Sequence, residues 1–174
     1  MLDQLTHLQM RPAEPDDIAL LNEIAFRSKA YWGYAPSRME SWRAELAVSP
    51  VWVSMQWAQV AVADDVIAGF FVIRSEAEQW RLEQLFVEPK AIRRGVGRAL
   101  VSRACRLAFD FGAVELLVDS DPNAEGFYLA CGAERIGSRA APIESAPLRT
   151  LPVLRFQRSK HPAPECSQTP IQTT

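Results

Sequence analysis

The sequence lacks the features that would place a protein in a membrane, on nucleic acid or around a metal. Its 174 residues contain only three cysteines, Cys105, Cys131 and Cys166, whose spacing matches no metal-ligand motif. It has no cationic, apolar leader and no apolar run of membrane length. Nineteen basic residues nearly balance 21 acidic ones, so the net charge of −2 gives no general attraction to nucleic acid. We therefore expect a metal-free, single-domain protein of the reducing cytoplasm, with no nucleic-acid or membrane partner.

Two common phosphate-binding loops are also missing around Gly95 and Gly97. A dinucleotide fingerprint would need a third glycine where Leu100 stands. A P-loop would need a Gly-Lys-Ser/Thr run, which does not occur. What is present is an apolar run over residues 82–87 and, past Gly97, apolar positions at helical spacing over residues 96–111. This pattern predicts a strand, a glycine loop and an amphipathic helix.

Such a loop leaves backbone N–H groups without partners at the positive end of the helix dipole. A phosphate or pyrophosphate is the guest that these groups would bind, and the glycines would let it approach the main chain. Taken alone, the pattern is equally compatible with a tight strand-to-helix turn.

A second motif follows about 30 residues further along the chain. Asp121 is expected to cap a helix that Gly132 ends. Between these two residues lie Asn123 and the pair Phe127 and Tyr128. The glycine loop and this second motif occur in a defined order and at a defined spacing, which makes them more specific together than either is alone.

Together the two motifs resemble the acyl-CoA site of the GNAT superfamily of N-acetyltransferases. The loop of that family follows the pattern Gln/Arg-x-x-Gly-x-Gly/Ala, and an Asn and a Phe-Tyr pair lie downstream of it. Gly95 and Gly97 match the loop, whereas Ile92 stands at its first position and departs from it. The resemblance implies an α/β (α+β) fold of the GNAT type: a mixed, mostly antiparallel sheet of six to seven strands flanked by about four helices.

The resemblance also implies a function and its partners. Residues 4–157 would form an acetyltransferase domain, and residues 158–174, which are polar and contain proline, a disordered tail. Acetyl-CoA would be the co-substrate, and its acetyl or short acyl group would pass to a primary amine by direct attack in a ternary complex. The acceptor would be a small-molecule or peptide amine of unspecified identity. A homodimer is compatible with the resemblance, since many members of the family pair.

The remaining sequence supplies the other elements of such a domain. Pro15, followed by two acidic residues, predicts the start of a first helix. Ser37 and Glu40 are spaced as a capping box, which predicts the start of a second helix. Strands are expected over residues 5–10, 52–63, 66–74, 80–87, 114–118, 133–139 and 150–157. The helix after Gly97 would join residues 80–87 to 114–118 as a parallel, right-handed crossover.

The resemblance assigns catalytic roles to Tyr128 and Glu83. A phenol is protonated at working pH, so Tyr128 would give its proton to the leaving thiolate; the alternative is a half-buried tyrosine bonded to the backbone. Glu83 would take the proton of the amine through water; the alternative is a surface or ion-paired glutamate. Strict alternation predicts one face with Arg81, Glu83, Leu85 and Val87, and the opposite face with Leu82, Gln84 and Phe86.

The expected contacts with acyl-CoA come from three places. A backbone N–H of Phe86 or Val87 would meet the acyl carbonyl, and Asn123 would bond the CoA arm or simply cap its helix. The phosphates would contact the glycine loop and its arginines, unless these arginines form a solvated face. The full set of expected acyl-CoA contacts is Phe86, Val87, Arg93, Arg94, Gly95, Val96, Gly97, Arg98, Asn123 and Tyr128.

An aromatic segment between the first two helices remains. Tyr31, Trp32 and Tyr34 either pack a helix connection or form a wall of the acceptor site, where ring faces would hold an amine. Two further functions stay open on the same fold: a non-catalytic acyl-CoA sensor and a partner-binding domain that uses these rings as its interface.

Overall fold

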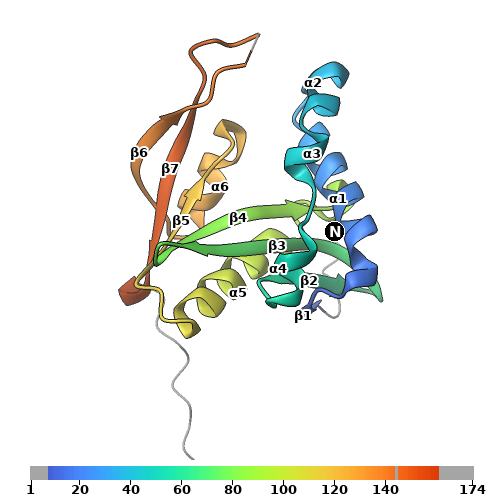
Figure 1. Ribbon diagram of the computed structural model, residues 1–174, viewed down its shortest axis with the longest axis vertical. Helices are drawn as coiled ribbons and strands as arrows, with labels where there is room; N and C mark the ends of the chain where they lie inside the picture. The colour runs from blue at the N-terminus through green and yellow to red at the C-terminus, as the bar shows by residue number, and fades with distance from the viewer. Residues whose placement is uncertain (1–7, 144, 161–174) are drawn as a thin grey trace, which may run out of the picture.

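The computed structural model describes residues 8–143 and 145–160. Seven strands form one mixed sheet in the order β1-β2-β3-β4-β5-β7-β6, and only the pair β4 and β5 is parallel (Figure 1). This confirms the predicted fold class. The strands are β1 (Leu8–Pro12), β2 (Ala58–Ala63), β3 (Val66–Glu76), β4 (Gln79–Val87), β5 (Glu115–Asp119), β6 (Glu134–Ala140) and β7 (Thr150–Gln157).

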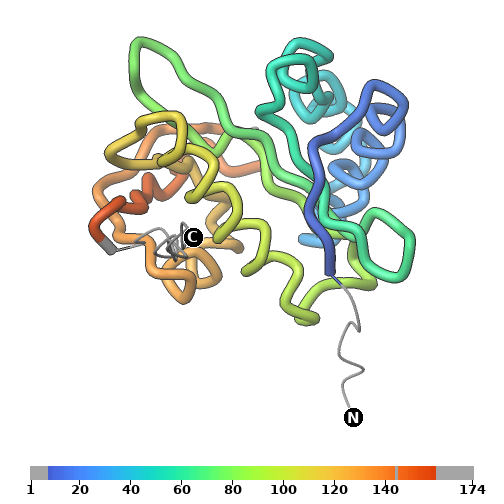
Figure 2. Tube along the Cα trace, turned by 90° about the horizontal axis from the view of Figure 1, so that it is seen from below, coloured from blue at the N-terminus to red at the C-terminus, as the bar shows by residue number. Residues whose placement is uncertain are grey.

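Helices cover both faces of this sheet, so the protein is a three-layer sandwich. Helix α5 lies across one face, which is the near face in Figure 2, and α6 packs on the same side. Helices α1 to α4 gather on the opposite face. The helices are α1 (Ile18–Ala30), α2 (Pro36–Ser41), α3 (Arg43–Leu46), α4 (Pro50–Ser54), α5 (Val96–Asp110) and α6 (Glu125–Ala130). Short 3-10 turns are η1 (Pro15–Asp17), η2 (Pro89–Ala91), η3 (Pro122–Ala124) and η4 (Arg158–Lys160).

Each face of the sheet has its own apolar core. Leu100, Val101 and Ala104 of α5 pack against strand residues such as Phe71 and Leu116, all almost fully buried. On the other face, residues of α1 and α4 pack against Phe70, Val60 and Val72. The apolar stripe expected at helical spacing past Gly97 is therefore the stripe that α5 buries.

Strand β4 contains a bulge that changes which residues share a face. Val72 pairs with Gln84 and Ile73 pairs with Leu82, so Glu83 is the extra residue. Leu82 consequently packs in the core under α5, together with Leu85 and Val87. The strict alternation expected from the sequence, which placed Leu82 with Gln84 and Phe86, is therefore wrong.

Strands β4 and β5 are joined over a very short stretch. Only Trp80 with Leu116 and Arg81 with Leu117 are in parallel register. Beyond Arg81, β4 continues to Val87 with no register partner on β5, and the two strands diverge. The crossover through α5 is the connection that the sequence predicted. We call the region in which the carboxyl ends of the two strands are no longer paired with each other the opening.

Two local expectations were wrong. The second helix starts at Pro36, with Ala35 as its N-cap, and Glu40 pairs with Arg43 instead of completing a capping box. The stretch expected as the start of the 52–63 strand is helical, because Ser49 caps α4 and Pro50 occupies its first turn.

The elements expected at the two ends of the chain lie partly outside the described residues. The expected first strand over residues 5–10 is observed as β1 from Leu8, and residues 4–7 lie outside the described part. Of the tail expected over residues 158–174, Arg158–Lys160 form the turn η4, and residues 161–174 lie outside the description. Within the described residues, no helix is long and apolar enough to cross a membrane.

Gly69 on β3 provides a test of how closely the sheet and α5 approach each other. A Cβ at this position would lie 2.7 Å from the carbonyl oxygen of Phe86 and 3.1 Å from Cδ1 of Leu100. Since backbone cannot give way cheaply, Gly69→Ala should lower the free energy of unfolding in urea by about 1–3 kcal/mol. Gly126→Ala is the matched control, because a Cβ there meets nothing within 4 Å and alanine favours the helix. Equal stability of Gly69→Ala and the unsubstituted protein would contradict the packing described here.

Candidate functional site

The glycine loop enters α5 with two residues in the left-handed region. Arg93 has φ +65° and Gly95, the N-cap of α5, has φ +87°. No side chain caps this helix, so the N–H groups of its first turn are directed out of the loop. Arg98 lies in the same turn, where its guanidinium donates to the carbonyl of Ala130 at 3.3 Å. The loop thus combines backbone donors, the positive helix end and arginine side chains.

The two sequence motifs meet in space at Gly97. A Cβ on Gly97 would lie 3.1 Å from Cζ and 3.2 Å from Cε2 of Phe127. The absence of a side chain therefore lets the first turn of α5 pack directly on the ring that precedes Tyr128. Gly95 is needed for its backbone conformation, and Gly97 for this close approach.

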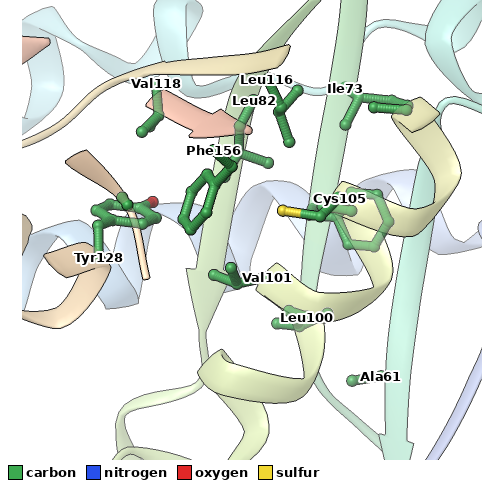
Figure 3. Close-up of a cluster of buried hydrophobic side chains, with 14 of the residues drawn as sticks. Ala61, Ile73, Leu82, Leu100, Val101, Cys105, Leu116, Val118, Tyr128 and Phe156 are labelled. Atoms are coloured by element: carbon green, nitrogen blue, oxygen red, sulfur yellow. The ribbon is translucent and has the colours of Figure 1, made fainter. Parts of the chain in front are cut away.

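Tyr128 is almost fully buried, with 6% of its surface exposed. Its ring contacts those of Phe127 at 5.0 Å and Phe156 at 6.4 Å between centroids, and Figure 3 shows it beside Phe156 in the core under the sheet. Burial raises the pKa of the Tyr128 phenol well above its ordinary value. The phenol is therefore protonated at neutral pH, as a proton donor must be.

The carboxyl end of β4 is tied to α1 by side chains. The N–H of Val87 donates to Oγ of Ser28 over 3.4 Å, a long contact. The Arg27 guanidinium binds both carboxylate oxygens of Glu88, at 3.1 and 2.8 Å. Phe86 turns its ring toward Phe70 in the core below α1, so its side chain is structural.

Glu83 lies on the face of the sheet that α1 to α4 cover. The bulge places it beside Arg74, whose Nε donates to Glu83 at 3.1 Å and whose NH1 donates to Glu76 at 2.8 Å. The negative charge of Glu83 raises the pKa of Arg74. Glu83 is therefore an ion-paired, half-exposed glutamate, which matches the alternative considered for it and leaves its role in proton transfer untested.

The aromatic segment after α1 divides into two parts. Tyr31 and Trp32 are 52% and 42% exposed and contact each other edge to face. Tyr34 turns inward, where its ring lies 5.0 Å from that of Trp42 and its hydroxyl donates to Asp121 at 2.8 Å. Only Tyr31 and Trp32 therefore present free ring surface.

Asp121 joins more segments than any residue expected from the sequence. Its Oδ1 accepts the backbone N–H of Asn123 at 2.9 Å and the Asn123 side-chain amide at 3.0 Å, as the expected cap. Its Oδ2 accepts from Nζ of Lys29 at 2.5 Å and from Tyr34, and the Arg149 guanidinium lies 3.6 Å away. One carboxylate thus links α1, the loop after α1, η3 and the loop before β7.

The electrostatics of Asp121 favour its charged form. Burial by itself raises the pKa of the Asp121 carboxyl, but the hydrogen bond and charge of Lys29, together with the hydrogen bonds from Asn123 and Tyr34, outweigh it and hold the pKa below its ordinary value of 3.8. The Lys29 ammonium also lies 5.1 Å from the ring centroid of Tyr34 and 5.0 Å from that of Trp42. A carboxylate and two ring faces therefore surround one ammonium group.

A second ion cluster holds the base of the opening. Arg81 of β4 donates to Asp119 of β5 at 2.6 Å, and Arg139 of β6 lies 2.9 Å from the same carboxylate. These pairs follow the last backbone pair between β4 and β5, so side chains continue the connection where the ladder stops. The sequence predicted neither this cluster nor the distant partners of Asp121, because the two residues of each pair are 20 to 92 positions apart in the chain.

Cys105 and Cys131 form no disulfide. Burial raises the pKa of the Cys105 thiol to about 12, so it stays protonated in the core. Cys166 lies outside the described residues. In the part of the chain that the structure describes, no three His, Cys, Asp or Glu side chains gather as metal ligands would.

Comparison with protein families gives one match that spans most of the site. The model of the family described as "Acetyltransferase (GNAT) family" matches residues 19–133. This range includes α1 except its first residue, the diverging strands β4 and β5, the glycine loop and Tyr128.

Solved structures share the fold over nearly the whole described chain. A GCN5-related N-acetyltransferase from Rhodopseudomonas palustris is 23% identical, with a TM-score of 0.71 over 88% of this chain and 97% of that one. PaiA N-acetyltransferase from Thermoplasma acidophilum, in complex with coenzyme A, is 19% identical, with a TM-score of 0.66 over 87% and 99%. YncA from Salmonella typhimurium, with its cofactor acetyl-CoA, is 16% identical, with a TM-score of 0.65 over 92% and 99%. These likenesses concern the fold.

The lowered pKa of Asp121 predicts how stability depends on pH. Because the carboxyl binds protons more weakly when folded, its contribution is complete above the ordinary pKa of 3.8 and is lost as pH falls through the folded-state pKa. Asp121→Asn should therefore lower the free energy of unfolding by about 1–3 kcal/mol at pH 7, with a smaller deficit at pH 3. Urea unfolding across this pH range measures it. Asp110→Asn, at an exposed position, is the control; an equal deficit for Asp121→Asn at both pH values would contradict the assignment.

Proposed function

Because this chain belongs to the acetyltransferase (GNAT) family, we propose that it moves an acetyl or related short acyl group from acyl-CoA to a primary amine. Family membership and the shared fold support acyl transfer in general. The finer proposal is direct attack by the amine in a ternary complex. The observation that supports it is the separation of β4 from β5 beyond Arg81, where the glycine loop and Tyr128 lie on the α5 face of the sheet and Lys29 of α1 reaches Asp121 after β5.

The glycine loop fits the pyrophosphate of CoA. Its uncapped helix start supplies backbone donors at Val96 and Gly97, and Arg93, Arg94 and Arg98 supply positive charge. Two of the compared structures hold CoA or acetyl-CoA, which supports CoA as the guest. Both nitrogen donors of Asn123 are directed to Asp121, so we assign its side-chain oxygen to the CoA arm. When bound, acyl-CoA supplies an activated acyl thioester.

The backbone N–H of Val87 is the donor that we assign to the acyl carbonyl. It lies where β4 has left its partner β5, and its long contact with Ser28 leaves it able to bond a stronger acceptor. A donor held in place before the reaction stabilises negative charge as it develops on oxygen.

Two side chains are assigned to proton transfer. Tyr128, kept protonated by burial, donates to the departing thiolate. Glu83 receives the proton of the amine through water, from the face of the sheet on which α1 to α4 lie. Tyr31 and Trp32 present exposed rings beside that face and are assigned to the wall of the acceptor site.

Binding of acyl-CoA is tested by thermal stability. A ligand bound only by the folded state at 100 times its Kd adds about 2.7 kcal/mol, which raises Tm by about 5–10 °C for a domain of this size. We expect this shift with acetyl-CoA and CoA, and none with NAD. No shift with acetyl-CoA or CoA would contradict the proposed function.

Tyr128→Phe tests the general acid. Removing one hydroxyl from a buried ring should lower kcat by about 100-fold while leaving the shift produced by CoA nearly unchanged. Release of CoA thiol, followed with a thiol reagent and an accepting amine, measures turnover. Turnover equal to that of the unsubstituted enzyme would remove Tyr128 from the mechanism.

Glu83→Gln tests the base. If the carboxylate accepts the proton, kcat/KM of the unsubstituted enzyme falls toward acidic pH, and this limb should be absent in the variant. Glu76→Gln is the matched control, since Glu76 also pairs with Arg74 but is far more exposed. An acidic limb retained by Glu83→Gln would assign the proton transfer to another group.

A further inference from the structure

The side chain of Lys29 crosses the opening on the face that an acceptor would use. Its neighbour Ser28 contacts Val87 at the end of β4, whereas the Lys29 ammonium reaches Asp121, which follows β5. Lys29 is 16% and Asp121 11% exposed at the side chain, so the pair is largely withdrawn from water. The Lys29–Asp121 ion pair therefore connects α1, beside Val87, to the residue that follows β5 and Ser120.

The surroundings of the Lys29 ammonium are those that recognise alkylammonium ions. Asp121 supplies a charged acceptor, Tyr34 supplies a hydroxyl on the same oxygen, and the rings of Tyr34 and Trp42 lie about 5 Å from Nζ. A carboxylate combined with aromatic faces is the usual composition of an ammonium site in a protein. In this structure the ammonium group between the carboxylate and the rings is that of Lys29, a residue of the same chain.

We propose that Asp121, Tyr34 and Trp42 form the binding site for the ammonium group of a cationic aliphatic amine, and that Lys29 occupies this site until such an amine displaces it. The inference rests on the proposed function and names the class of acceptor. Displacement would anchor the acceptor through this ammonium group, and a second amino group of the same acceptor, in its neutral form, would attack the acyl carbonyl at Val87.

Charge makes this exchange selective. One primary ammonium replacing another keeps the same contacts and leaves no group unpaired. A molecule without a cationic group that displaced Lys29 would leave a largely buried carboxylate whose one remaining charged partner among the described residues is the Arg149 guanidinium, 3.6 Å away. Loss of a partner from a buried charge is unfavourable, so this step disfavours molecules that carry no ammonium group.

Lys29→Met tests the displacement directly, because it keeps the length of the side chain and removes the competing charge. The apparent Kd of a ligand is its intrinsic Kd divided by the fraction of molecules whose site is open, so n-pentylammonium should bind the variant at least about tenfold more tightly. Thermal shift titration without acyl-CoA measures this for the unsubstituted protein, Lys29→Met and Lys29→Arg. Lys29→Arg keeps a cation and should behave as the unsubstituted protein does.

Three controls make the result decisive. The double variant Lys29→Met/Asp121→Asn should lose the gain, and 1-pentanol should bind all variants alike; Lys29→Gln replaces Lys29→Met where the latter does not fold. Equal affinity of n-pentylammonium for the unsubstituted protein and the neutral variant, or a gain that survives Asp121→Asn, would overturn the ammonium site. A parallel titration with CoA reports on the proposed function separately, because loss of that shift leaves the amine comparison intact.

Discussion

The short parallel contact between β4 and β5 is the constraint on which the rest of the structure depends. Two register pairs, at Trp80 and Arg81, hold the strands together. Beyond these pairs each strand continues to its end without pairing with the other. Backbone N–H groups in a sheet normally donate to the neighbouring strand, so a strand that separates from its neighbour has N–H groups available to other acceptors. The N–H of Val87 is such a donor, and its only contact in the described residues is the long one to Ser28.

In this region, side-chain ion pairs connect the strands and loops in place of backbone hydrogen bonds. Asp119 joins Arg81 and Arg139 at the base of the opening, and Asp121 joins Lys29, Tyr34 and Arg149 at its mouth. Ion pairs of this kind exchange partners more readily than a backbone ladder does. The proposed displacement of Lys29 from Asp121 rests on this difference.

Local features were predictable wherever they depend on residues that are close together in the sequence. Gly95 opens α5 because its φ of +87° suits glycine, and Asp121 caps η3 because its side chain reaches Asn123 two residues away. The bulge at Glu83 was not predictable, because an extra residue is defined only by the register of the facing strand. That single residue moved Leu82 to the opposite face from the one that alternation predicts.

The sequence by itself determined the crossover through α5 and the two motifs, because each depends on periodicity, caps and turns within a few residues, and the fold class followed from the family that the two motifs resemble. Only the tertiary structure decided which side chains meet at the opening. Lys29 and Asp121 are 92 positions apart, and nothing local to either predicts the other. Their contact follows from where the sheet places α1 and the end of β5, since long-range ion pairs are set by the packing of whole elements and leave no periodic signal in the chain.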